Sequence, residues 1–68
     1  MGLQVGIVGA GLMGHGIAQV FATAGHCVRI TDADQRVLDG VPGRVSASLV
    51  ELNIEEAPVL ARIKLSQL

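Results

Sequence analysis

Apolar residues in the first half of the chain follow two different spacings. Residues 3–8 form a short, largely apolar run rich in valine and isoleucine. Such a run is typical of a parallel strand covered on both faces. Apolar side chains then recur every three or four residues, which predicts a helix; they are Met13, Ile17, Val20, Phe21 and Ala24. Residues 27–31 predict a second strand, so the pattern indicates a βαβ unit with parallel strands and a right-handed crossover.

A further helix is expected after the second strand, with Asp32 or Asp34 as its N-cap and with apolar positions between 37 and 41. Pro42 lacks a main-chain N–H and its ring clashes with the preceding turn, so we expect an interruption there. A helical stripe resumes over residues 45–52, and Asn53 and Pro58 bracket the next predicted break. Residues 63–65 predict the start of a short third strand.

A glycine-rich turn separates the first strand from the first helix. Its sequence is Gly9-Ala10-Gly11-Leu12-Met13-Gly14, which has the Gly-x-Gly-x-x-Gly spacing. In a dinucleotide-binding turn the first glycine allows a tight bend, the second admits the pyrophosphate, and the third lets the helix pack closely. The next two residues after the second glycine would offer main-chain amides at the positive end of the helix dipole. A turn of this spacing can also bind nothing, but the strand before it and the helix after it favour a dinucleotide.

Asp32 ends the second apolar run, where a carboxylate would accept hydrogen bonds from the adenosine ribose hydroxyls. Its charge would repel a 2′-phosphate, so NAD is favoured over NADP, unless Arg29 or Arg36 softens that repulsion. Asp34 is the alternative ribose ligand, and Asp32 could instead simply end the strand or cap a helix. The predicted cofactor-binding residues are Gly9, Ala10, Gly11, Leu12, Met13, Gly14 and Asp32.

Composition limits the number of domains, the partners and the compartment that we expect for this chain. The chain has 68 residues, half of them apolar, and a net charge of −1, so it predicts one small domain without a basic patch for nucleic acid or a membrane surface. Cys27 is the only cysteine, which allows no internal disulfide, provides no thiol zinc site and favours a reducing compartment. No stretch approaches the roughly 18–20 apolar residues of a membrane span, and no signal peptide is evident. We therefore expect a cytoplasmic protein.

We expect none of the histidines and glutamates to be catalytic or to bind a metal. His15 would lie in the first helical turn with no acidic residue near it in sequence, so it is interpreted as a surface or pocket-edge residue. His26 follows Gly25 and is interpreted as a turn residue. The glutamates at 51, 55 and 56 are expected to form a solvated helix end.

Residues 5–21 resemble the N-terminus of NAD-dependent 3-hydroxyacyl-CoA dehydrogenases, and Ala24-Gly25-His26, the second strand and Asp32 continue the likeness. The stretch 11–14 alone also resembles 6-phosphogluconate and 3-hydroxyisobutyrate dehydrogenases, but residues 16–19 favour the acyl-CoA family. The resemblance implies an α/β fold: a partial Rossmann fold with parallel strands, formed by the βαβ unit, the following helix and the short third strand. It also implies NAD-linked oxidation of 3-hydroxyacyl-CoA to 3-ketoacyl-CoA in fatty acid metabolism.

In that family the catalytic histidine, its glutamate partner and the helical domain that binds acyl-CoA lie further along the chain. Neither His15 nor His26 matches the position of the catalytic histidine. We therefore expect residues 1–68 to be the N-terminal portion of a dinucleotide-binding domain, with acyl-CoA as a partner only if a catalytic half is supplied. The alternatives are a non-catalytic nucleotide-binding or interaction module and a non-functional truncated product; the sequence leaves the oligomeric state undefined.

Overall fold

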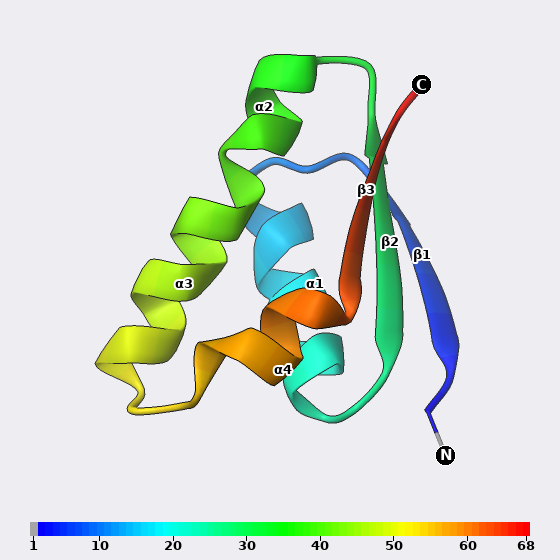
Figure 1. The fold of residues 1–68 in the computed structure, drawn as a ribbon. Coiled ribbons are helices and arrows are strands. Elements are labelled where there is room, and N and C mark those ends of the chain that lie inside the picture. Colours follow the sequence, from blue (N-terminus) through cyan, green and yellow to red (C-terminus); the bar gives the residue numbers. More distant parts are fainter. Residues whose placement is uncertain (1) are drawn as a thin grey trace.

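The computed structural model describes residues 2–68, apart from the side chain of Leu12. Three strands alternate with helices along these residues (Figure 1). The strands are β1 (Gln4–Val8), β2 (Cys27–Asp32) and β3 (Ile63–Gln67). The helices are α1 (Leu12–Thr23), α2 (Gln35–Asp39), α3 (Val41–Glu51) and α4 (Glu56–Ala61). No helix in the described part of the chain is long and apolar enough to cross a membrane.

All three strands are parallel, and β2 lies in the middle of the sheet. Val28 of β2 is the register partner of Val5 on one side and of Ile63 on the other. The helices lie on one side of the sheet (Figure 1). This arrangement confirms the predicted α/β fold, in which a βαβ unit is followed by helices and a short third strand.

The core forms between the sheet and the helices. Val28 and Ile30 of β2 are buried while Arg29 between them is exposed, because successive side chains of a strand point to opposite faces. The small side chains of Ala18 and Ala22 let α1 lie close to β2. The later helices contribute five more buried apolar side chains, which are Leu38, Val41, Val45, Leu49 and Val59, and Ala10 of the glycine turn is also buried. Each fully buried aliphatic side chain of this size contributes about 1.5–3 kcal/mol relative to an exposed one.

Pro42 lies in the first turn of α3 and does not interrupt a helix. The sequence predicted an interruption at this proline and a return to helix at residue 45, whereas α3 already begins at Val41. Pro42 therefore lies in the first turn of α3, where a missing N–H leaves no intrahelical hydrogen bond unmade and the fixed φ suits a helix. Gly40 is the residue shared between the end of α2 and the start of α3.

The predicted break between Asn53 and Pro58 is shorter than expected. Asn53 has a φ of 60° and follows Leu52, the C-cap of α3. The helix α4 begins at Glu56, with Pro58 in its first turn. The helix α4 was not predicted. The third strand predicted at 63–65 is confirmed and extends to Gln67.

Candidate dinucleotide-binding site

The glycine turn begins where β1 ends. Gly9 has a φ of 99°, a conformation that side-chain-bearing residues rarely adopt, so the bend out of the strand requires glycine here. The Gly9 N–H donates to the carbonyl oxygen of Thr31 across 2.7 Å, which anchors the turn to the end of β2.

Gly14 is in close contact with the start of the same turn. A Cβ atom at Gly14 would collide with the carbonyl oxygen of Gly9, so only glycine allows α1 to lie this close. A Cβ atom at Gly11 would meet nothing within 4 Å. The space beside Gly11 is thus open, as a site for a phosphate group requires.

The helix α1 begins directly after Gly11, beside which this open space lies. Gly11 is the N-cap of α1, and none of the described side chains makes a capping hydrogen bond there. The first amides of a helix have no partner within the helix and carry the positive end of its dipole. The amides at Leu12 and Met13 therefore belong to a helix end suited to an anion.

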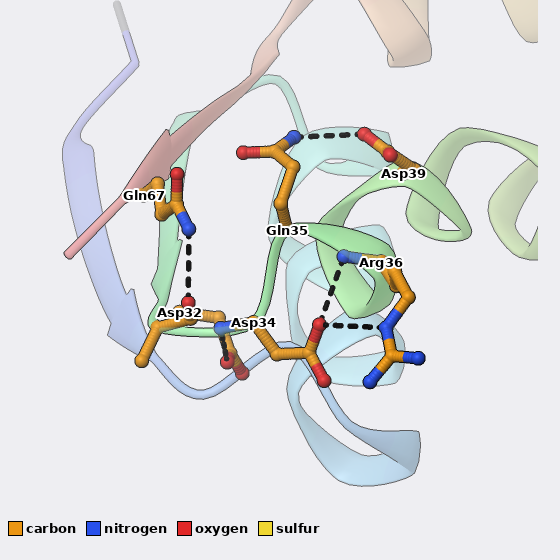
Figure 2. Close-up of polar contacts among 7 residues, drawn as sticks. Asp32, Asp34, Gln35, Arg36, Asp39 and Gln67 are labelled. Atoms are coloured by element: carbon orange, nitrogen blue, oxygen red, sulfur yellow. Dashed lines mark hydrogen bonds and ion pairs between the residues drawn. The ribbon is translucent and has the colours of Figure 1, made fainter.

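The Asp32 carboxylate joins the glycine turn to the loop after β2. Its Oδ2 accepts a hydrogen bond from the Ala10 N–H, and its Oδ1 accepts one from the Asp34 N–H, each across 2.8 Å. The second of these contacts is seen in Figure 2. These two N–H groups, that of Ala10 first, hold the pKa of the Asp32 carboxyl below its ordinary value. Each carboxylate oxygen has a second lone pair, which leaves capacity for ribose hydroxyls.

Asp34 makes different contacts. Its carboxylate caps α2 by accepting from the Arg36 N–H across 2.9 Å, and Oδ1 lies 3.5 Å from Nε of Arg36 (Figure 2). The helix N-cap is therefore Asp34 and not Asp32. Arg36 is held by Asp34 with its side chain 92% exposed, while Arg29 is exposed on a different face of β2 from buried Ile30. The geometry favours Asp32 over Asp34 as the carboxylate beside the glycine turn.

The histidines occupy structural positions. His15 is half-buried, and its Nδ1 lies 3.0 Å from the carbonyl oxygen of Gly11, which places it at the edge of the turn as expected. His26 accepts the Leu3 N–H at Nδ1 across 3.0 Å, and its ring centroid is 5.9 Å from that of Phe21. Among residues 2–68 no group of three or more His, Cys, Asp and Glu side chains could hold a metal ion.

Several polar contacts were not predicted from the sequence, among them one between helices and one beside Asp32. Glu56 was expected to be solvated, but it is half-buried and accepts a hydrogen bond from the Ser46 hydroxyl, so this prediction was wrong. The Gln67 side-chain amide donates to the Ala33 carbonyl oxygen across 3.0 Å, which ties the end of β3 to the loop beside Asp32 (Figure 2). Neither contact leaves a signal in the sequence pattern, because each joins segments that are brought together only by the fold.

Comparisons with known proteins agree with this geometry. The sequence model of a protein family, the NAD-binding domain of 3-hydroxyacyl-CoA dehydrogenase, matches residues 4–66 of this chain. A probable 3-hydroxybutyryl-CoA dehydrogenase of Deinococcus radiodurans is 42% identical over 67 residues, which cover 90% of this chain and 24% of that protein. A probable 3-hydroxyacyl-CoA dehydrogenase of Caenorhabditis elegans is 43% identical over 50 residues, covering 74% of this chain and 17% of that protein.

A solved structure has the same fold. The crystal structure of (S)-3-hydroxybutyryl-CoA dehydrogenase PaaH1 from Ralstonia eutropha superposes with a TM-score of 0.74 at 36% identity, covering 96% of this chain and 25% of that one. The chain thus spans about a quarter of this structure and of the bacterial relative, and less of the nematode protein. The chain belongs to the 3-hydroxyacyl-CoA dehydrogenase NAD-binding domain family, and its cofactor is NAD.

Proposed function

We propose that residues 9–14 and Asp32 hold the adenosine diphosphate half of NAD. The main-chain amides at Leu12 and Met13, at the open N-terminus of α1, would bind the pyrophosphate. The Asp32 carboxylate would accept the ribose hydroxyls. The hydrogen bond from Ala10 to Asp32 carries this proposal, because it brings the ribose-reading carboxylate against the turn that would hold the phosphates.

The whole protein of which such a domain is part is proposed to oxidise a 3-hydroxyacyl-CoA to the 3-ketoacyl-CoA, as the names of the relatives suggest. NAD, when bound, supplies the hydride acceptor. Residues 1–68 would be the N-terminal portion of its dinucleotide-binding domain, and acyl-CoA would bind only where the remaining length of the relatives is supplied. We place this role in fatty acid metabolism and in the cytoplasm. Alone, residues 1–68 would bind the nucleotide without turnover.

Fluorescence titrations with NADH and NADPH test the nucleotide site. We expect saturable NADH binding, and we expect Asp32→Ala to weaken NADH about tenfold, more than NADPH, because charged hydrogen bonds to the ribose hydroxyls are lost. Asp34→Ala is the matched control: it removes the α2 cap and leaves NADH affinity unchanged. Absence of saturable binding up to millimolar NADH, or equal losses for the two cofactors, would contradict the proposal.

A further inference from the structure

His15 lies beside the part of the glycine turn that would hold the pyrophosphate. Its Nδ1 is 3.0 Å from the carbonyl oxygen of Gly11. Gly11 is also the residue beside which a Cβ atom would meet open space. Only the span of one residue and one hydrogen bond would separate the imidazole from a phosphate that touches Gly11. That span is within about 10 Å, the Debye length at 0.1 M ionic strength, so the two charges would interact.

The hydrogen bond to Gly11 fixes which ring nitrogen of His15 can take up a proton. A carbonyl oxygen only accepts, so this contact requires a hydrogen on Nδ1. A neutral imidazole has one N–H, which leaves the free lone pair on Nε2. Protonation at Nε2 then adds a positive charge and keeps the contact with Gly11. The ring can therefore change its charge without leaving its place beside the turn.

Few other groups around α1 change their charge near neutral pH. Helix α1 and strand β1 contain no Asp, Glu, Lys or Arg. Carboxyl and guanidinium groups ordinarily titrate outside the range of about pH 5 to 8 in which imidazole changes its charge. The charged or titratable side chains on the other elements that pack against α1 are Cys27, Arg29 and Asp32 of β2, Arg44 and Glu51 of α3, and Glu56 of α4.

The three β2 groups do not compete with His15 in this role. Arg29 is exposed between two buried residues, so it points to the face of the sheet away from α1. The N–H groups of Ala10 and Asp34 hold the pKa of the Asp32 carboxyl below its ordinary value, which keeps it ionised near neutral pH. Cys27 is the first residue of β2, whereas the glycine turn lies beside the end of that strand.

We propose that His15 is a further residue of the cofactor site, which binds the pyrophosphate more tightly when its imidazole is protonated. The inference rests on the proposed nucleotide site. Before the anion binds, the positive end of the α1 dipole disfavours an imidazolium. The two negative charges of a pyrophosphate favour it. Binding is therefore accompanied by proton uptake, and by linkage a fall in pH tightens binding.

The test is a calorimetric titration with ADP-ribose, which contains the pyrophosphate of NAD, at about pH 5.5 and pH 8.5 and at constant ionic strength. We expect an affinity about fivefold higher at the lower pH. His15→Asn should remove this difference, because an asparagine amide can still donate to the Gly11 carbonyl but gains no charge. His26→Asn is the matched control and should keep the pH dependence. It changes the only other histidine, which accepts the Leu3 N–H beyond the far end of α1.

Salt gives a second readout, because at about 1 M the Debye length falls to about 3 Å and the pH dependence should disappear. Circular dichroism at both pH values checks that each variant folds. Equal affinity at the two pH values, the same pH dependence in His15→Asn, or its loss in His26→Asn would overturn the role of His15 and leave the nucleotide site standing. Absence of saturable ADP-ribose binding at both pH values would overturn the nucleotide site itself, and the role of His15 with it.

Discussion

The main-chain N–H of Ala10 donates a hydrogen bond to Oδ2 of Asp32 across 2.8 Å and so joins the turn after β1 to the end of β2. The other oxygen of the same carboxylate accepts the Asp34 N–H. One side chain therefore fixes the glycine turn relative to the next loop. Binding of a dinucleotide to a turn that is already ordered costs less conformational entropy than binding to a flexible one.

This relationship predicts a pH dependence of stability. The pKa of Asp32 in the folded protein is below its ordinary value of 3.8, so the carboxylate stabilises the fold above that pH and loses its contribution as pH falls through the folded pKa. We expect the urea midpoint, followed by circular dichroism, to drop in this acidic window. Asp32→Asn should show a smaller drop. An identical pH profile for the two proteins would contradict the assignment.

Gly14→Ala tests the close approach of α1 to the turn. The added methyl group collides with the Gly9 carbonyl, and we expect a loss of about 1–3 kcal/mol in the free energy of unfolding, with weaker NADH binding. Gly16→Ala is the matched control in the same helix: its Cβ atom meets open space, so the change should stabilise by roughly 0.5–1 kcal/mol. Urea unfolding measures both, and destabilisation of equal size would refute the contact.

Leu49→Ala tests the core between α3 and the other elements. Leu49 is fully buried, so the cavity left behind should lower the free energy of unfolding by about 2–5 kcal/mol. A domain of 68 residues has only about 3–10 kcal/mol in total, so this variant should be close to unfolding at 25 °C. Leu52→Ala, at a side chain that is 59% exposed, should change stability by less than about 0.5 kcal/mol. Comparable losses at both positions would argue against this core.

Asp34→Ala tests the N-cap of α2. The substitution removes the acceptor of the Arg36 N–H and should cost about 1 kcal/mol in thermal or urea unfolding. Asp39→Ala is the control at the other end of the helix, where the carboxylate accepts only the exposed Gln35 amide (Figure 2). That pair contributes roughly 0.2–0.5 kcal/mol. If Asp39→Ala were the more destabilising change, the capping assignment would be wrong.

Local sequence patterns predicted the elements of the first half of the fold, because the apolar spacing and the turn-forming glycines agree there. They did not predict which residues are buried. The predicted apolar stripe of α1 includes Met13, Ile17 and Val20, which are exposed, whereas its buried side chains are Ala18 and Ala22. The strand β1 was expected to be covered on both faces, but its residues alternate between exposed and half-buried. The helical spacing that ends before Gly25 corresponds to α1, and Gly25 has the positive φ expected of a residue that follows a helix.

The helix boundaries in the second half depend on Pro42 and Pro58, and the sequence alone predicts helix breaks at both prolines. A proline is equally compatible with the first turn of a helix, and only the packing of Val41 and Val59 into the core decides between the two.

The sequence predicted Asp32 as the ribose ligand with Asp34 as the alternative, and the sheet adds the contacts that distinguish the two carboxylates. The register that pairs Val8 with Thr31 brings the turn after β1 beside the end of β2, and Ala10 then reaches Asp32. Sequence spacing places both aspartates near the strand end and contains no information on which N–H each one accepts.

The middle position of β2 has a consequence for how the chain folds. Neither of its neighbours is joined to it by a tight hairpin: one ladder closes only after α1 and the other only after α2, α3 and α4. Both ladders are therefore non-local contacts, and such contacts slow folding relative to helical bundles of similar length. We expect a single cooperative folding transition in which β2 orders together with both partners, so that a chain cut before β3 would lose the whole sheet and not one edge.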